Sequence, residues 1–329
     1  MRPMRRREFI TWVGGIAAWP LAAHAQRPEM PVVGFVHVAS AKGGYAPHLS
    51  AFLKGGSEAG YVDGRNVTIE YRWAEGRSDR LPAMVADLVH RQVAVIAATT
   101  TAAALAAKAA TTTIPIVFEM ASDPVRLGLV ASLNRPGGNV TGVTQRNREI
   151  SPKRLQMLHE LVPTARVVAL LINPNDPTAE TNTKEAQTAA RSLGLELHVL
   201  NASTERDFDA VFAKLIELRA GGLVILPDPF FISRSEQLAT LALRHAVPTI
   251  YQNREFAAAG GLVSYGADVA DAYRLTGVYV GRVLKGEKPA DLPVQQTTKV
   301  ERYINLKTAK ALGLTIPNTL IGRADEVFE

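Results

Sequence analysis

The sequence contains no cysteine among its 329 residues. This absence excludes disulfide bonds, cysteine-ligated zinc, iron–sulfur clusters, a thiol nucleophile and a lipid-modified N-terminal cysteine. Aromatic residues make up only 6% of the chain, which argues mildly against an extended groove that stacks sugars. Hydrophobic residues nevertheless reach 47%, so the chain can bury the cores of about two domains.

Over most of the chain there is little excess of positive over negative charge. The formal net charge is +6, but four of the 37 basic residues and one of the 31 acidic residues lie in the first 25 positions. The remainder therefore carries 33 basic and 30 acidic side chains, a net charge of only +3. This balance predicts a well-mixed surface and no nucleic-acid partner.

The sequence also lacks the motifs of common catalytic and cofactor sites. It contains no glycine-rich phosphate loop and no Gly-x-Gly-x-x-Gly turn. Residues 55–59 approach a nucleophile elbow, but the serine falls inside a predicted helix. His159 begins a sequence like a zinc-protease helix, but Pro163 occupies the position of the second histidine. We therefore expect no enzymatic activity, no metal and no cofactor.

The first 25 residues have the pattern of a twin-arginine export signal. Arg6 and Arg7 precede an uncharged stretch at 11–23, and Ala23-His24-Ala25 is a small-x-small triplet. The uncharged stretch is shorter than the roughly 20 residues that a membrane-spanning helix needs. We therefore expect cleavage after Ala25 and a mature chain in the bacterial periplasm.

Strands alternate with amphipathic helices in two successive series. The first series has predicted strands at 31–38, 67–73, 93–98 and 114–118, and helices near 49–59, 79–90 and 102–110. The second has strands at 167–172, 196–200, 223–226 and 249–251, and helices at 152–161, 179–193, 208–219 and 234–245. The tail adds 262–264, a helix at 268–284, a strand near 294–298 and a helix near 306–312. This alternation predicts an α/β fold with two doubly wound parallel sheets.

Two such series in one chain predict two similar lobes joined by a hinge with several crossings. After the signal at 1–25, we expect lobe 1 to contain 28–145 plus about 266–288. Lobe 2 is expected to contain 148–263 plus about 292–329. The hinge crossings are expected near 143–150, 264–267 and 292–296, and the mature protein is expected to be a monomer.

Ligands of open α/β sheets bind outside the carboxyl ends of the strands, so the loops that follow the predicted strands are candidate ligand loops. Thr100 and Thr101 precede the helix at 102–110, whose free N–H groups could receive a carboxylate. Plain N-capping explains these threonines equally well. The complete candidate set is Ser40, Tyr45, Thr100, Thr101, Asp123, Asn173, Asp176, Asp228, Phe230, Tyr251 and Tyr265.

Three aspartates of this set, Asp123, Asp176 and Asp228, could bind an ammonium group. Each of them precedes a proline, and Asp-Pro is also common turn chemistry. The aromatic members of the set could stack on a flat ligand, although an aromatic residue after a strand is also common in a core. We expect at least one of the three carboxylates to bind the ligand.

Several longer motifs resemble those of a known family. They are Ser-Asp-Pro-Val at 122–125, Arg-Pro-Gly-Gly-Asn-Val-Thr-Gly at 135–142, Arg-Glu-Phe at 254–256, Leu-Lys-Gly-Glu-Lys-Pro-Ala-Asp-Leu-Pro-Val at 284–294 and Ile-Asn-Leu-Lys-Thr-Ala-Lys at 304–310. Together they resemble the ABC transporter substrate-binding protein family, whose members include binders of tryptophan and other aromatic amino acids. The resemblance implies a type I periplasmic-binding fold that closes on a small ligand and then docks on a membrane permease. It also implies ligand residues close to Ser40, Thr100, Thr101, Asn173, Asp228 and Tyr251.

These observations predict a periplasmic receptor that delivers a small polar or amphipathic solute, an amino acid or a related carboxylate, to an ABC importer. One alternative is a ligand-sensing partner of a membrane signalling protein, which could use the same fold and the same loops. Another is an enzyme built on the two-lobe fold, which the missing nucleophile and metal motifs disfavour. Co-purification with a permease or with a sensor, and turnover of a bound compound, would separate these alternatives.

Overall fold

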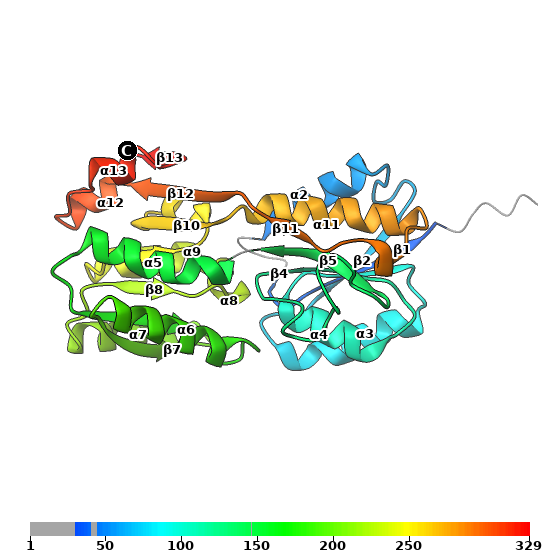
Figure 1. Ribbon diagram of the computed structural model, residues 1–329, viewed down its shortest axis with the longest axis horizontal. Coiled ribbons are helices and arrows are strands. Elements are labelled where there is room, and N and C mark those ends of the chain that lie inside the picture. The colour runs from blue at the N-terminus through cyan, green and yellow to red at the C-terminus, as the bar shows by residue number, and fades with distance from the viewer. Residues whose placement is uncertain (1–29, 41–44, 146) are drawn as a thin grey trace, which may run out of the picture. The chain divides into compact units, whose positions relative to one another are not determined.

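The computed structural model describes residues 30–40, 45–145 and 147–329 (Figure 1). The predicted export signal therefore lies outside the described residues. Residues Pro31–Glu329 form one compact unit. This unit contains two β-sheets with helices on both faces, so the predicted α/β fold with two sheets is confirmed.

The first sheet has the strand order β11-β5-β4-β3-β1-β2, and every neighbouring pair is parallel. Its strands are β1 (Val32–His37), β2 (Thr68–Trp73), β3 (Val95–Ala98), β4 (Ile116–Met120), β5 (Val140–Gln145) and β11 (Gln295–Thr297). The helical segments of this part are α2 (Ala46–Glu58), η1 (Ser78–Arg80), α3 (Leu81–His90), α4 (Thr101–Ala110), α11 (Val269–Leu284) and η2 (Pro289–Asp291).

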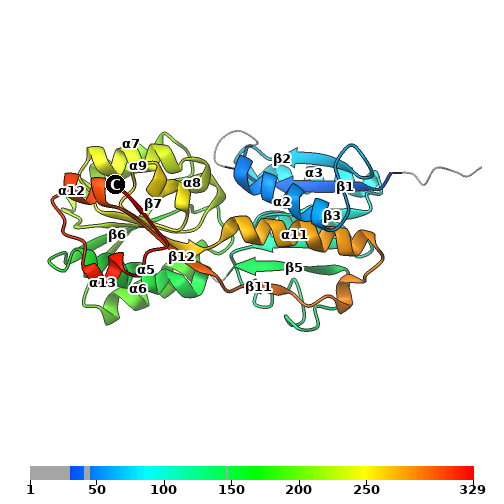
Figure 2. The same cartoon turned by 90° about the horizontal axis from the view of Figure 1, so that it is seen from above.

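Both faces of the first sheet are covered, which explains why its central strands β1, β3 and β4 are mainly apolar. Alternate side chains of a strand point to opposite faces. Val33 and Phe35 of β1 belong to the same buried cluster as Phe52 of α2, whereas Val36 belongs to the cluster that contains Leu88 of α3. Figure 2 shows α2 and α11 lying side by side over the sheet.

Glycine allows the close approach of α2 and α11. A Cβ at Gly277 would lie 2.1 Å from the carbonyl oxygen of Phe52, and one at Gly55 would lie 1.8 Å from the carbonyl oxygen of Arg274. The sequence around Gly55 that approaches a nucleophile elbow therefore serves helix packing. The contact matters for the site because α11 brings Tyr273 to the ligand pocket.

The second sheet has the order β13-β12-β10-β9-β8-β6-β7, and its pairs are parallel except for the antiparallel pair β10–β12. Its strands are β6 (Val167–Ile172), β7 (Glu196–Asn201), β8 (Leu223–Ile225), β9 (Thr249–Tyr251), β10 (Val263–Ala267), β12 (Val300–Asn305) and β13 (Glu326–Phe328). Its helices are α5 (Asn147–Leu161), α6 (Ala179–Ser192), α7 (Asp207–Glu217), α8 (Pro229–Ser233), α9 (Ser235–Arg244), α10 (Arg254–Ala258), α12 (Leu306–Ala311) and α13 (Asn318–Ile321).

Helices α5 and α6 lie on one face of the second sheet, and α7 and α9 lie on the other. Leu158 of α5 shares a buried cluster with Leu170 of β6, whereas Leu171 shares a different cluster with Phe212 of α7 and Leu238 of α9. Successive side chains of β6 point to opposite faces, so the strand packs against the helices on both sides of the sheet.

Some elements differ from the sequence-based expectation. The structure adds β5, α8, α10, β12, α13 and β13, which the hydrophobic pattern does not predict. In β5 the signal is weak because Gly142 interrupts the strand, and glycine is depleted in strands. A Cβ at Gly142 would lie 2.2 Å from the carbonyl oxygen of Phe118, so the close approach of β4 and β5 requires glycine there.

The chain crosses between the two sheets three times, after β5, after β10 and after β11. The first crossing falls within the expected 143–150. The expected crossing at 264–267 is instead part of β10, and the one at 292–296 includes the start of β11, which pairs with β5. Residues 295–297 therefore belong to the first sheet, although we expected them in lobe 2, because β5 offers an open edge there.

Two of these crossings lie next to each other. The backbone N–H of Asp268 donates to the carbonyl oxygen of Lys299 over 3.2 Å, and the Lys299 ammonium lies 3.5 Å from the Asp268 carboxylate. The second and third connections are therefore joined by a hydrogen bond and an ion pair.

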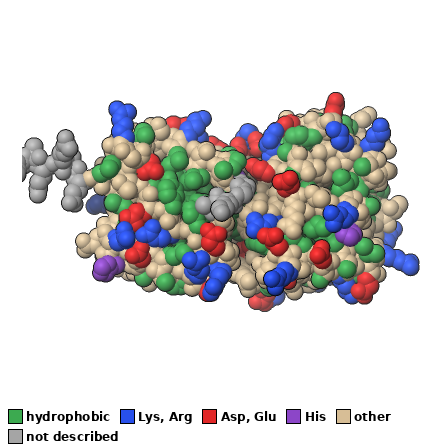
Figure 3. Space-filling model, turned by 180° about the vertical axis from the view of Figure 1, so that it is seen from behind, with side chains coloured by type: hydrophobic (Ala, Val, Ile, Leu, Met, Phe, Trp, Pro, Cys, Tyr) green, Lys and Arg blue, Asp and Glu red, His purple; other side chains and the backbone are tan. Residues whose placement is uncertain are grey.

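Among the described residues, no helix combines the length and the apolar character that a membrane span requires. Acidic and basic side chains are interspersed on the face shown in Figure 3, in agreement with the balanced charge of the sequence outside its first 25 positions.

Candidate ligand-binding site

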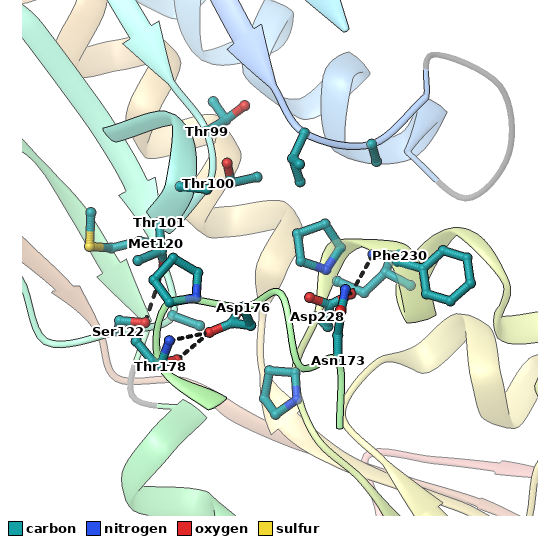
Figure 4. A pocket seen from close by; sticks show the side chains of 18 of the residues that line it. Thr99, Thr100, Thr101, Met120, Ser122, Asn173, Asp176, Thr178, Asp228 and Phe230 are labelled. Atoms are coloured by element: carbon teal, nitrogen blue, oxygen red, sulfur yellow. Dashed lines mark hydrogen bonds between the residues drawn. The ribbon is translucent and has the colours of Figure 1, made fainter. Parts of the chain in front are cut away.

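A pocket with an empty volume of about 990 Å³, open solvent included, lies at the carboxyl ends of strands from both sheets. The first sheet contributes residues at the ends of β4 and β5 and residues that follow β1, β3 and β4, and the second contributes residues that follow β6, β8 and β9. Such strand ends are where open α/β sheets bind ligands. Figure 4 shows side chains from both sheets facing this space.

The threonine-rich start of α4 lines the first-sheet side of the pocket. The Thr100 hydroxyl accepts a hydrogen bond from the Ala103 N–H over 3.2 Å, so Thr100 is the N-cap of α4. The hydroxyls of Thr101 and Ser122 lie 3.1 Å apart. Thr100 therefore does both of the things expected of it. Its side chain caps the helix, and it lines the pocket together with the first turn of α4.

Asp228 lies on the second-sheet side, directly before α8. Its Oδ1 accepts hydrogen bonds from the Phe230 N–H over 2.8 Å and from the Asn173 side-chain amide over 3.1 Å. Burial, with a smaller contribution from the nearby Asp176 carboxylate, raises the pKa of Asp228 to about 7. Both hydrogen bonds fall on Oδ1, so Oδ2 is the oxygen that can meet a ligand.

Asp176 borders the same side of the pocket. Its Oδ1 accepts hydrogen bonds from the backbone N–H and the hydroxyl of Thr178, each over 2.6 Å. The turn chemistry that Asp-Pro predicts is therefore present at Asp176, and N-capping is present at Asp228, while both residues also line the pocket.

Glu119 is a buried carboxyl group at the end of β4 that lines the pocket with only 4% of its surface exposed. The side-chain amide of Gln145 donates to its Oε1. Burial raises the pKa of Glu119 to about 8, although the Gln145 hydrogen bond opposes this shift. The sequence placed Glu119 in a strand-end loop but gave no reason to choose it.

Gln252 is a second lining residue that the candidate set does not include. It follows β9, has 3% of its surface exposed, and its Oε1 has no hydrogen-bond donor among the described residues. An unpaired buried oxygen of this kind costs about 1–3 kcal/mol. A donor group of a bound ligand could offset that cost.

Behind the first-sheet side, three aromatic rings form a hydrogen-bonded support. The His37 Nδ1 accepts from the Ala39 N–H over 2.9 Å, so the proton lies on Nε2, which donates to the Tyr273 hydroxyl over 3.1 Å. The Tyr273 hydroxyl then donates to the Thr99 carbonyl oxygen over 3.2 Å. Burial lowers the pKa of His37 to about 3, so the ring is neutral, and the Tyr45 ring packs against it with centroids 4.2 Å apart.

Seven of the eleven candidate residues line this pocket. They are Tyr45, Thr100, Thr101, Asn173, Asp176, Asp228 and Phe230. The Phe230 ring stacks on Phe208 with centroids 5.5 Å apart, the Arg234 guanidinium lies 6.0 Å from its centre, and the residue is only partly buried.

The other four candidates are not among the described residues that line the pocket. Ser40 lies at the end of the described segment 30–40. Asp123 borders a second cavity and accepts from the Val125 N–H over 2.9 Å, as its Asp-Pro turn predicts. Tyr251 is fully buried behind Asp228, to whose carbonyl oxygen its hydroxyl donates over 3.4 Å.

Tyr265 differs from the expectation because it lies within β10, not after it. Its carbonyl oxygen accepts from the Arg154 Nε over 2.6 Å, and the Arg302 guanidinium lies 5.1 Å from the centre of its ring. The ring therefore packs against the partly buried Arg302, and Tyr265 is not among the residues that line the pocket.

The pocket is acidic. Glu119, Asp176 and Asp228 line it, whereas no lysine, arginine or histidine of the described residues does so. In the described part of the chain, no group of three or more His, Asp or Glu side chains is placed to hold a metal ion. The electrostatics of the described lining therefore favour a ligand with a cationic or hydrogen-bond-donating group.

Two mainly parallel sheets, three crossings and a pocket at the strand ends of both define the type I periplasmic-binding fold. The chain belongs to the ABC transporter substrate binding protein family, whose model matches residues 38–328. The resemblance found in the sequence motifs is thereby confirmed.

Individual relatives are similar over most of the chain. A tyrosine-binding protein of Clostridioides difficile (strain R20291) is 27% identical over 263 residues, which cover 80% of this chain and 75% of that protein. A structure of a conserved domain protein from Vibrio cholerae O1 biovar El Tor strain N16961 matches with a TM-score of 0.83 and 25% identity, covering 91% of this chain and all of the other. A Streptococcus pneumonia ABC domain in complex with L-Trp matches with a TM-score of 0.81 and 25% identity, covering 91% of this chain and 99% of the other.

Proposed function

We propose that this chain is the receptor of an ABC importer and binds an amino acid or a closely related amine-bearing carboxylate. The observation that carries the proposal is Asp228, a buried carboxyl group with one oxygen left for a ligand, in a pocket whose described lining contains no basic side chain. An ammonium group is the natural partner of such a carboxylate.

The other end of an amino acid has a matching site on the opposite sheet. The first turn of α4, with Thr100 and Thr101, provides backbone N–H groups and the positive end of a ten-residue helix. A carboxylate at α4 and an ammonium at Asp228 would connect the two sheets through the ligand. We propose that this bridge favours the closed form of the protein, with motion about the three crossings.

The remaining lining suits an amphipathic side chain. Phe230 and Tyr45 are aromatic residues of the lining, and Phe230 is only partly buried. Two of the relatives described above are named for tyrosine and L-Trp, and they support an aromatic amino acid as the first compound to test.

The site of action in this proposal is the periplasm. The export pattern with Arg6 and Arg7 supports it, and the closed monomer would dock transiently on a permease in the inner membrane. Family membership and the substrate-binding relatives support a role in binding and not in catalysis.

The experiment begins with native mass spectrometry of the purified chain without residues 1–25, followed by thermal melting with amino acids, small carboxylates, sugars and nucleosides. A ligand at about a hundred times its dissociation constant adds roughly 2.7 kcal/mol to the free energy of unfolding, enough for a shift of a few degrees. An amino acid that raises the melting temperature and is recovered unchanged supports the proposal. Stabilisation by sugars or nucleosides alone, or conversion of the compound, would refute it.

A further inference from the structure

Glu119 faces a different part of the pocket from the start of α4. Val117, two residues before it in β4, belongs to the buried cluster that contains Tyr45 and Tyr273. Phe118 belongs to the cluster of α3 and α4 on the other face. Since side chains alternate along a strand, Glu119 shares the face of Val117 and points toward α11, away from α4.

The surroundings of Glu119 leave part of its carboxyl group without a protein partner. Its one hydrogen bond to a described residue comes from Gln145 and falls on Oε1, and no basic side chain of the described residues lines this pocket. Of the titratable groups nearby, Tyr45 and Tyr273 interact with it electrostatically, and burial raises the pKa of both. Burial of a carboxyl group with so little compensation costs several kcal/mol when the group is ionised.

Asp228 follows β8 of the second sheet, and the Tyr45 ring lies near both Asp228 and Glu119. Charges on Glu119 and on Asp228 both influence Tyr45, which is 2% exposed and lines the pocket. The two carboxyl groups therefore border the same cavity from opposite sheets. A ligand that fills the cavity meets both of them.

We propose that Glu119 is a specificity-determining residue that receives a second hydrogen-bond donor of the ligand, a cationic or neutral N–H or O–H group on the side chain. This inference rests on the proposed function, in which Asp228 holds the ammonium group and α4 the carboxylate. Glu119 then selects among amino acids by the far end of their side chains.

A purely structural role is the competing explanation. The bond between Glu119 and Gln145 joins the ends of β4 and β5 just before the first crossing. Glutamine could keep that bond, because its single side-chain oxygen can accept from Gln145. The second carboxylate oxygen would be replaced by an NH2 group, which donates and cannot accept from a ligand donor, and the amide would carry no charge.

The test compares binding of two matched ligand pairs, L-tyrosine with L-phenylalanine and L-lysine with L-norleucine, by isothermal titration calorimetry. Within each pair one member has a donor at the far end of its side chain and the other lacks it. The variants are Glu119→Gln and, as a control, Glu185→Gln, which removes a carboxylate that lines the second cavity. Thermal melting verifies that both variants fold.

At pH 8.5 the Glu119 carboxyl group, whose pKa is about 8, is mostly ionised. At this pH we expect the unmodified protein to prefer the donor-bearing member of at least one pair by about tenfold or more, as for a hydrogen bond to a charged group. Glu119→Gln should reduce that preference about tenfold, whereas Glu185→Gln should leave it unchanged. Equal preferences in the unmodified protein and Glu119→Gln, or no preference in either, would overturn this inference alone. If the unmodified protein binds none of the four compounds but another amino acid stabilises it, the role of Glu119 fails alone. If no amino acid stabilises it, the amino-acid proposal fails as well.

Discussion

The substitution Asp228→Asn tests the proposed ammonium site with little disturbance of the fold. Asparagine caps helices about as well as aspartate, so the bond from the Phe230 N–H is retained. The side-chain oxygen can also still accept from Asn173. The exchange therefore removes the charge and leaves the shape, whereas Asp228→Ala would also remove the cap and cost about 1 kcal/mol.

The expected loss follows from the burial of the carboxyl group. A hydrogen bond to a charged partner contributes about 1.5–3 kcal/mol, so the affinity for an ammonium-bearing ligand should fall by about 10- to 150-fold. Since burial raises the pKa of Asp228 to about 7, the carboxylate is mostly ionised at pH 8, and the loss should be greatest there. The melting temperature of the ligand-free protein should not fall at this pH, because the variant no longer buries a charge.

The assay is calorimetric titration at pH 8 with a ligand that stabilises the unmodified protein, together with thermal melting. Asp123→Asn is the matched control, because Asp123 also precedes a proline and accepts from the N–H two residues later, over 2.9 Å, but borders the second cavity. The control should bind as the unmodified protein does. An Asp228→Asn variant that melts normally and binds with unchanged affinity would remove Asp228 from the site.

Three further outcomes follow from the structure. Because the folded protein holds the pKa of Glu119 at about 8 and the unfolded chain near 4.5, the folded state binds more protons between these values. The free energy of unfolding should therefore fall by a few kcal/mol from pH 5 to pH 8 in denaturant titrations. Glu119→Gln should make this fall smaller. An equal fall in the variant would contradict the raised pKa of Glu119. Gly277→Ala should lower the unfolding free energy by about 2 kcal/mol or more, because its Cβ would lie 2.1 Å from the Phe52 carbonyl oxygen. A melting temperature equal to that of the unmodified protein would show that α2 and α11 can move apart at no cost. Tyr273→Phe removes the donor to the Thr99 carbonyl oxygen, so the affinity should fall several-fold with a stability loss of about 1 kcal/mol, and unchanged calorimetric binding would exclude a supporting role.

The hydrophobic pattern of the sequence was sufficient to predict most strands of the two sheets. Strands such as 167–172 and 249–251 coincide with β6 and β9, because a strand covered on both faces is continuously apolar and bounded by turn residues. The elements that the pattern missed have weaker patterns for physical reasons. Gly142 interrupts β5, and β12 is a half-buried strand in which polar and apolar residues do not alternate, so it lacks the two-residue period of a strand.

The rule that ligands bind at strand ends was sufficient to bring Thr100, Asn173 and Asp228 into the candidate set before their positions were known. The same rule also selected Asp123 and Tyr251, which the structure places elsewhere. A loop after a strand can turn its side chains toward the pocket or away from it. That choice depends on the neighbouring loops, which the local sequence does not contain.

The sequence by itself determined the alternation of strands and helices, the family motifs and the polar loops at the strand ends, since these depend on local spacing and composition. Only the tertiary structure decided which side chains share the pocket. Glu119 faces it because strand alternation turns the residue toward α11, and Tyr273 reaches it because the second crossing returns α11 to the first sheet. The acidic character of the site arises where residues from distant segments meet, which is a property of the packing of two sheets and not of any one segment.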